Sequence, residues 1–132
     1  MAEKGQNESI IHKLVVRYLS WLKLLYNHSP NEGKRSPQQA SYLKSLGMQA
    51  GFPDLFIYEP TTQYHGLAIE LKREKGGRVS EAQRYWIDEL NKRGYLAVVC
   101  KGYDEAQRVI DDYRKDISYG REKNVCQDHS IK

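Results

Sequence analysis

The middle of the chain reads Gly66-Leu67-Ala68-Ile69-Glu70-Leu71-Lys72-Arg73. Leucine or isoleucine occupies every second position, and the residues between them are Ala68, Glu70 and Lys72. Successive side chains of a β-strand point to opposite faces, so this alternation predicts a strand at Gly66–Arg73 with one aliphatic face. The opposite face then carries an acid and a lysine two residues apart.

A second strand is predicted just before it, at Asp54–Tyr58, where apolar and aromatic residues run up to Glu59-Pro60. The short connection between the two strands favours an antiparallel hairpin. Pairing the strands with both aliphatic sides in the core places three polar side chains on a common surface: Asp54, Glu70 and Lys72.

Helices are predicted on both sides of this hairpin. In the first half of the chain, apolar residues recur at helical spacing over Ser9–Tyr26. Residues 28–35 are rich in Pro, Asn and Gly, which predicts a loop. Ser36-Pro37 then begins a short helix that ends at Gly47.

In the second half, Ser80-Glu81-Ala82-Gln83 is typical of a capping box, and its helix is predicted to run to Arg93. The apolar run Tyr95–Cys100 is typical of a strand buried on both faces, and helical spacing returns over Asp104–Ile117. The fold class is therefore predicted as α/β, a mixed β-sheet flanked by helices in the order α-α-β-β-α-β-α. One domain is expected over residues 1–119, followed by a polar, flexible tail at residues 120–132.

The composition excludes several classes of protein. Lys and Arg number 21 against 17 Asp and Glu, so the net charge of +4 is mildly basic; it fits a partner with phosphates without proving one. The four histidines and two cysteines lack the spacing of a zinc site, and no P-loop pattern occurs. A polar N-terminus and the charges within residues 10–25 predict neither a signal peptide nor a membrane span, so a reducing, cytoplasmic location is expected.

The predicted surface of Asp54, Glu70 and Lys72 has the chemistry of a metal-dependent phosphodiesterase. Two carboxylates from adjacent strands supply the hard oxygen ligands that Mg²⁺ or Mn²⁺ prefers, and such an ion polarises a phosphodiester oxygen. The ammonium of Lys72 could orient the attacking water or neutralise charge that builds up on the phosphate. The alternative is that Glu70 and Lys72 simply lie on a solvated strand face, as such pairs commonly do.

Four segments together resemble the VRR-NUC domain, the virus-type replication-repair nuclease branch of the PD-(D/E)xK superfamily. They are Gly51-Phe52-Pro53-Asp54-Leu55, Gly66–Lys72, Ser80 with Gln83, and Trp86–Tyr95, and the resemblance extends over about residues 31–113. It implies a restriction-endonuclease-like core and divalent-metal-dependent hydrolysis of DNA. One departure is Ile87, where related nuclease branches carry a tyrosine.

The resemblance also implies roles for individual residues. Asp54, Glu70 and the backbone carbonyl of Leu71 would bind Mg²⁺ or Mn²⁺, and Lys72 would be the catalytic lysine. Glu8 corresponds to an acid of the family's first helix that helps to order the metal, although an acid in a first helical turn also complements the helix dipole.

Gln83 resembles a helix glutamine that lies near the active site of the family. Its position three residues after Ser80 also completes the capping box, which stabilises the helix whether or not the residue contributes to the chemistry.

Two basic stretches are candidates for binding the phosphate backbone of DNA. Lys34 and Arg35 precede the second predicted helix, and the loop after the predicted catalytic strand contains three more cations: Arg73, Lys75 and Arg78. Charged loops are usually just solvated, so the argument for a role is the position of the second stretch directly after the catalytic strand. No base-reading motif occurs, which favours recognition of DNA shape over DNA sequence.

Stand-alone phage-type members of the family are associated with homodimers and with branched DNA such as Holliday junctions. The function predicted from the sequence is therefore a homodimeric DNA endonuclease that depends on Mg²⁺ or Mn²⁺ and is selective for branched DNA, located in the bacterial host cytoplasm if it is phage-encoded. Two alternatives stay open. They are a basic DNA-binding module without catalysis, and a nuclease of the same fold that acts on RNA or on DNA ends.

Overall fold

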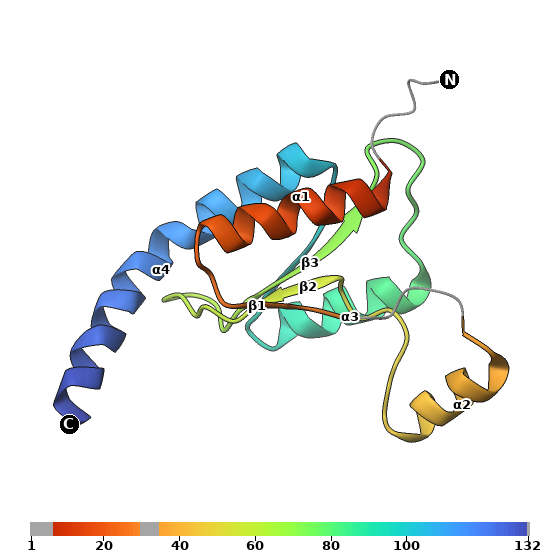
Figure 1. The fold of residues 1–132 in the computed structure, drawn as a ribbon, viewed down its shortest axis with the longest axis horizontal. Coiled ribbons are helices and arrows are strands. Elements are labelled where there is room, and N and C mark those ends of the chain that lie inside the picture. Colours follow the sequence, from red (N-terminus) through yellow and green to blue (C-terminus); the bar gives the residue numbers. More distant parts are fainter. Residues whose placement is uncertain (1–6, 30–34, 132) are drawn as a thin grey trace.

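The computed structural model describes residues 7–29 and 35–131, with side chains up to residue 117. Within these residues, four helices and four strands follow one another along the chain (Figure 1). They are α1 (Glu8–Trp21), β1 (Tyr26–His28), α2 (Pro37–Ser45), β2 (Leu55–Ile57), β3 (Leu67–Lys72), α3 (Glu81–Lys92), β4 (Leu96–Lys101) and α4 (Tyr103–Ile131). The predicted α/β class, with a mixed sheet flanked by helices, is confirmed.

The strands form one sheet in the order β1-β2-β3-β4. β2 pairs antiparallel with β3 in a register that sets Leu55 opposite Ile69, so the predicted hairpin is confirmed. β3 pairs parallel with β4, because α3 carries the chain back across the sheet between them. β3 is thus an interior strand, and all six of its residues are buried.

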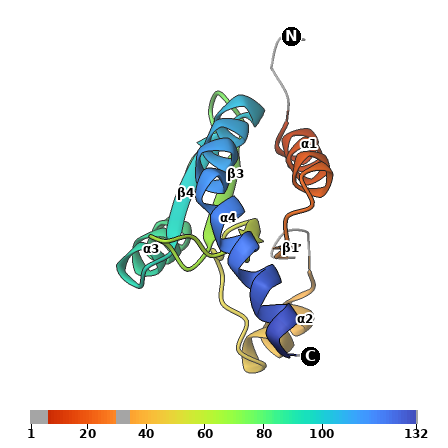
Figure 2. The same cartoon turned by 90° about the vertical axis from the view of Figure 1, so that its left-hand side faces the viewer.

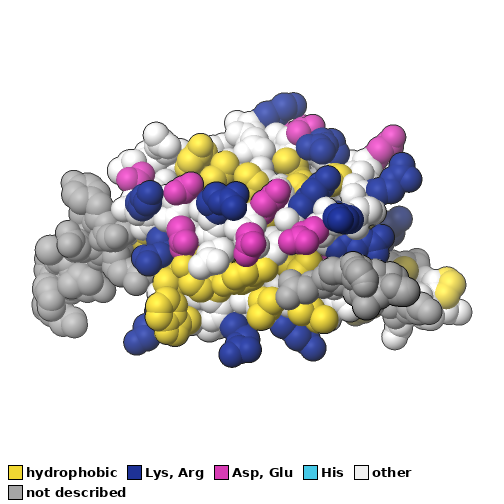
Figure 3. Space-filling model, turned by 90° about the horizontal axis from the view of Figure 1, so that it is seen from above, with side chains coloured by type: hydrophobic (Ala, Val, Ile, Leu, Met, Phe, Trp, Pro, Cys, Tyr) yellow, Lys and Arg dark blue, Asp and Glu magenta, His cyan; other side chains and the backbone are white. Residues whose placement is uncertain are grey.

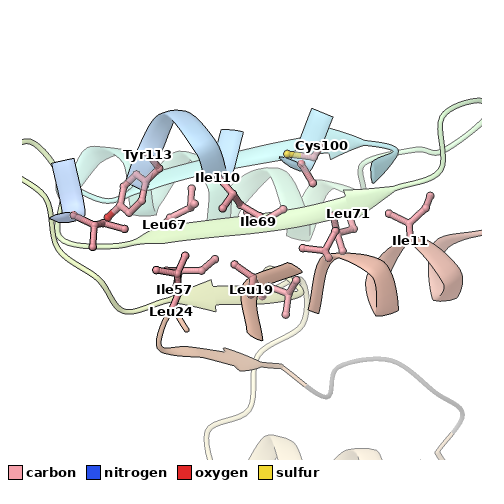
Figure 4. Close-up of a cluster of buried hydrophobic side chains, with 14 residues drawn as sticks. Ile11, Leu19, Leu24, Ile57, Leu67, Ile69, Leu71, Cys100, Ile110 and Tyr113 are labelled. Carbon is pink, nitrogen blue, oxygen red and sulfur yellow. The ribbon is translucent and has the colours of Figure 1, made fainter. Parts of the chain in front are cut away.

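The sheet separates two hydrophobic clusters. α1 and α4 pack together over one face of the sheet, and α3 covers the other face (Figures 1 and 2). The larger cluster lies under α1 and α4 and contains the aliphatic side chains of β2 and β3, including Ile57, Ile69 and Leu71 (Figure 4). The smaller cluster lies under α3 and is rich in aromatic side chains, with Phe56 buried at its centre.

The first half of the chain differs from the prediction by one strand. The order is α-β-α-β-β-α-β-α, because Tyr26–His28 pairs with β2 and becomes β1. These three residues show no apolar alternation, so the sequence gives no strand signal there. The first helix accordingly ends at Trp21 instead of Tyr26, since Lys23 adopts a φ of 61°, outside the right-handed helical region.

The second half differs in burial and in helix length. The prediction that Tyr95–Cys100 is buried on both faces is wrong in part, because β4 is an edge strand and most of its residues stay half-buried or exposed. α4 continues to Ile131 and does not end at Ile117, since residues 118–131 contain no proline and several good helix formers. The flexibility of residues 120–132 stays a prediction. No helix in the described part of the chain combines the length and the apolar character needed to cross a membrane.

α2 stands apart from the rest of the molecule, at the lower right of Figure 1. None of its residues is buried. A capping box fixes its start, since Ser36 Oγ accepts from the N–H of Gln39 and the amide oxygen of Gln39 accepts from the N–H of Ser36. α2 is therefore held by its own cap and by the chain on either side more than by packing.

Candidate active site

Asp54 lies directly before β2 and faces the end of β3. Its side chain is only 8% exposed, and Oδ2 accepts a hydrogen bond of 2.7 Å from the backbone N–H of Leu71. Because Leu55 lies opposite Ile69 in the antiparallel ladder, one further step along the same register brings Asp54 opposite Glu70. The structure therefore brings together the two carboxylates that the sequence places on one surface.

The segment before β2 is held against the start of α3. Gly51 has a φ of +92°, and a Cβ at this position would lie 2.5 Å from the backbone of Ala82, so only glycine fits. The ring of Phe52 packs edge-on against Trp86 of α3, with 4.9 Å between the ring centroids. These contacts tie the entry to β2 to the helix that carries Gln83.

Glu70 and Lys72 are buried on the side of β3 that faces α3. They are 3% and 7% exposed, and Nζ of Lys72 lies 3.5 Å from Oε2 of Glu70. The alternative in which this pair lies on a solvated strand face is therefore wrong. A buried ion pair gains little net stability once its desolvation is counted, and buried titratable groups concentrate at functional sites.

Gln83 joins this pair from the first turn of α3. Its Nε2 donates a hydrogen bond of 2.8 Å to Oε2 of Glu70, the same oxygen that Lys72 approaches. Its Oε1 accepts from the N–H of Ser80, so the predicted capping box is confirmed as well. A single amide group therefore caps the helix and contacts the buried carboxyl group at the same time.

The other oxygen of Glu70 has no such partner. Oε1 is buried and accepts no hydrogen bond from any described residue. Burial, followed by the nearby charge of Asp54, raises the pKa of Glu70 to about 8, while Lys72 acts in the opposite direction. A cation bound at Oε1 would satisfy the orphaned oxygen and offset the repulsion between the two carboxylates.

The donor set fits Mg²⁺ or Mn²⁺. Mg²⁺ is commonly bound through one or two carboxylates while it keeps several waters, which matches the pair Asp54 and Glu70. In residues 7–29 and 35–117, no three or more His, Cys, Asp or Glu side chains form a group that could enclose a metal ion. The predicted third ligand is a backbone group, the carbonyl of Leu71 on β3, and this role stays a prediction.

Glu8 approaches the same end of β3 from α1. Its Oε2 accepts a hydrogen bond of 3.4 Å from the N–H of Arg73, the residue after Lys72, and its charge contributes to the raised pKa of Glu70. Asn7 caps α1 directly before it and fixes the start of the helix. Glu8 therefore lies near the two acids without forming a three-acid group with them, and its part in metal binding stays a prediction.

The predicted DNA-binding cations fall at two places. Arg73, Lys75 and Arg78 are exposed on the loop that leaves β3, just beyond Lys72. Arg35 lies before α2 and lines a hollow beside α3. Lys34 is outside the described residues. The contact of these cations with DNA stays a prediction.

The last residue of β1 and the residue after it also contact the site, which the sequence does not indicate. The N–H of Ser29 donates to the carbonyl of Asp54 at 3.0 Å, and Nδ1 of His28 lies 3.3 Å from the same oxygen. His28 in turn packs edge-on against His12 of α1, at 4.6 Å between ring centroids. The residues lie in a segment predicted as a loop, so only the pairing of β1 with β2 reveals their proximity.

Comparison with known proteins identifies the fold. A family model described as the VRR-NUC domain matches residues 4–104. The chain belongs to the VRR-NUC family. A solved structure described as "VRR_NUC domain protein" is 34% identical to this VRR-NUC chain; the match covers 85% of this chain and 91% of that one, with a TM-score of 0.74. Among curated proteins, none matches.

Membership of the VRR-NUC family places the buried carboxylates in a nuclease-type fold. The family is a nuclease domain, for which DNA is the expected substrate, and its nucleases generally depend on divalent metals. The matched region contains Glu8, Asp54, Glu70, Lys72 and Gln83.

Proposed function

We propose that this VRR-NUC chain is a DNA endonuclease that hydrolyses phosphodiester bonds with the help of Mg²⁺ or Mn²⁺. The observation that carries the proposal is the state of Glu70. Its carboxyl group is buried beside Asp54 and Lys72, and one of its oxygens has no partner among the described residues. A group this costly to bury is understandable if a cation and a phosphate bind there.

The two carboxylates have distinct supports. Oδ2 of Asp54 is held by the N–H of Leu71, and Oε2 of Glu70 is held by Gln83 and Lys72. Asp54 and Glu70 would hold the ion, with Oε1 of Glu70 as one ligand atom and the carbonyl of Leu71 as a further one. When bound, Mg²⁺ or Mn²⁺ polarises a phosphodiester oxygen and lowers the pKa of a water.

Lys72 supplies positive charge at the same place. Its ammonium is buried 3.5 Å from Glu70, in surroundings from which most water is excluded. An ammonium held there in advance stabilises the negative charge that develops on a phosphate oxygen as the bond to the leaving group breaks. Gln83 acts as a positioning residue, because its amide fixes the oxygen of Glu70 that Lys72 also contacts.

The finer part of the proposal is a homodimer that is selective for branched DNA such as Holliday junctions. One catalytic site cuts one strand, so symmetric cleavage of a junction requires two sites related by a twofold axis. Exposed apolar side chains support a partner surface along α1 and the segment after it: Ile10, Trp21 and Leu25. Seen from the α1 and α4 side, such hydrophobic surface lies beside a band of interleaved acidic and basic side chains (Figure 3).

The decisive experiment uses labelled linear, flapped, forked and four-way DNA with Mg²⁺, Mn²⁺ or EDTA. We expect metal-dependent cleavage that is abolished in Asp54→Asn and Glu70→Gln. Asp112→Asn is a matched control, because Asp112 is an exposed acid of α4 that pairs with Lys115. A folded wild-type protein that binds DNA but cuts none of these substrates with either metal would instead be a DNA-binding module.

The oligomer and the choice of nucleic acid need separate measurements. Sedimentation of the wild-type chain is expected to give twice the mass of one chain, and Trp21→Glu is expected to halve it. A single-chain mass for the wild type would remove the homodimer from the proposal. Matched RNA substrates are expected to stay intact, and preferred cleavage of RNA would reassign the substrate.

A further inference from the structure

We propose that the hollow between α2 and the start of α3 binds an unpaired nucleotide of the DNA substrate. This inference rests on the proposed function and narrows it. The preferred substrate would carry unpaired bases close to the bond that is cut, which a fully paired duplex does not offer.

The hollow exists because α2 is not packed against the sheet. It has a volume of about 510 Å³, and it is lined by Arg35, Leu43, Met48, Phe52 and Trp86 among others. A second hollow of about 460 Å³ continues along α2 and shares several of these residues. Both volumes lie in the range of sites that take small organic molecules or single nucleotides.

The hollow is lined by residues that neighbour those of the candidate active site. Its lining includes Ser29, whose N–H donates to the carbonyl of Asp54. Phe52 precedes Asp54 by two residues, and Trp86 lies one helical turn beyond Gln83 on α3. A nucleotide in the hollow would therefore be a close neighbour of a phosphate bound at the two carboxylates.

The lining has the chemistry of a nucleotide site. Phe52 and Trp86 pack edge-on, and bases of any sequence stack on such aromatic side chains. Among the described residues, Arg35 and Lys44 are the charged ones that line the two hollows, and no acid lines either hollow. A cation beside aromatic rings suits a phosphate that carries a base.

A hollow at α4 provides the contrast. It has a similar volume of about 420 Å³, but its described lining includes Asp112 and Asp116, with Lys115 as the one cation among those residues. Acidic side chains repel a phosphate backbone, so the same ligand would not bind there. Of these hollows, the one between α2 and α3 has both a cation, Arg35, and the ring pair Phe52 and Trp86, without an acid among its described lining residues.

Tryptophan fluorescence tests the proposal without cleavage. The chain has two tryptophans, so Trp21→Phe leaves Trp86 as the only tryptophan, and Trp21 is 75% exposed. In EDTA, this variant is titrated with a duplex that has a single-stranded thymine flap, and with the same duplex whose flap is abasic. We expect quenching of Trp86 and binding about tenfold tighter with the thymine flap, as one base–aromatic stack contributes.

Substitutions then locate the contact. Phe52→Leu is expected to reduce the difference between the two flaps, and Arg35→Ala is expected to weaken binding of both, because it removes charge and not stacking. Tyr42→Ala is the matched control, since Tyr42 is an exposed aromatic residue of α2 that lines neither hollow. It is expected to bind both flaps as the Trp21→Phe parent does.

Two results would overturn the inference. One is equal affinity for the two flaps with unchanged Trp86 emission. The other is Trp86 emission that changes with protein concentration in the absence of DNA, because a second copy would then occupy the hollow. The cleavage assay separates this inference from the proposed function. If the protein cuts DNA but binds the two flaps equally, the proposed function stands and the nucleotide site does not. If it binds the thymine flap more tightly but cuts no DNA, the nucleotide site stands and the proposed function does not.

Discussion

Gln83 links the cap of α3 to the buried carboxyl group of Glu70. Its amide oxygen accepts from Ser80 at 2.9 Å, and its amide nitrogen donates to Glu70 at 2.8 Å. The start of α3 therefore cannot shift without moving a donor away from the site. α2 begins with the same capping box, made by Ser36 and Gln39, on a helix without buried residues. The two boxes allow capping to be separated from the contact with Glu70.

We predict that Gln83→Glu retains the fold and loses activity. A carboxylate can still accept from Ser80, but it cannot donate to Glu70 and it adds negative charge beside that residue. The single-turnover cleavage rate is expected to fall by about 10- to 100-fold, while the melting temperature stays close to that of the wild type. The same change on α2, Gln39→Glu, should leave cleavage intact. Equal losses in both variants would contradict the assigned contact.

Replacing Glu70 is predicted to stabilise the metal-free protein while abolishing cleavage. Glu70→Gln removes a carboxyl group whose burial disfavours its ionised form, and Gln is nearly the same size. In EDTA at neutral pH, we expect the melting temperature to rise by a few degrees, since about 1 kcal/mol moves it by roughly 3–6 °C in a domain of this size. Calorimetry measures the change. A lower melting temperature would show that the carboxyl group stabilises the fold.

Metal affinity is predicted to depend on pH through Glu70. Its pKa of about 8 lies above the ordinary value of 4.5, so protons compete with the cation below pH 8. The apparent affinity for Mn²⁺ is expected to fall by about tenfold for each pH unit below that value. The stability of the metal-free fold changes with pH in the opposite direction. The folded chain binds this proton more tightly than the unfolded chain does, so the free energy of unfolding falls as pH rises from about 4.5 to 8. Titration calorimetry and thermal melts check the two trends, and Glu70→Gln should remove both.

Gly51 is predicted to be irreplaceable for a steric reason. Gly47 and Gly51 both have positive φ, 104° and 92°, so alanine strains the backbone at either position. Only at Gly51 does a Cβ also collide with the backbone of Ala82, whereas nothing lies within 4 Å at Gly47. We expect Gly51→Ala to unfold at a clearly lower denaturant concentration than Gly47→Ala and to cleave more slowly. Equal midpoints in urea would show that the close approach to α3 carries no cost.

The exposed cations after β3 are predicted to bind phosphates. Lys75→Ala with Arg78→Ala is expected to weaken DNA binding equally for all sequences. Each lost phosphate contact lowers the slope of log affinity against log salt by about 1. Fluorescence anisotropy at several salt concentrations measures that slope. Lys115→Ala, which removes an exposed cation of α4 that pairs with Asp112, is the control and should leave it unchanged.

The sequence reveals the part of the site that depends on strand alternation. The aliphatic alternation of β3 indicates which face of the strand is in the core, through Leu67, Ile69 and Leu71. If β2 and β3 form a hairpin, Asp54 and Glu70 must then lie near each other. The capping box is equally local, since Ser80 and Gln83 are three residues apart. These features could be predicted because each depends on contacts between near neighbours or on a two-residue period.

Features that depend on distant contacts could not be predicted. β1 is a strand only because Tyr26–His28 meets β2, and nothing in three polar and aromatic residues indicates that pairing. Glu70 and Lys72 are buried because α3 covers their face of the sheet. From the sequence alone, charged residues on a strand usually indicate a face that is exposed to solvent. The hydrogen bond from the Gln83 amide to Glu70 likewise cannot be predicted without knowing where α3 lies relative to β3.

Because the sheet keeps its two hydrophobic clusters apart, structural support and chemistry fall on opposite sides of the same strand. The aliphatic residues of β3 are anchored under α1 and α4, while the alternate residues of the same strand are available to the reaction. Substitutions on α2, which has no buried residues, can therefore accumulate without loosening the main anchor. Proteins built on this plan are able to diversify their substrates while their thermal tolerance is inherited largely unchanged.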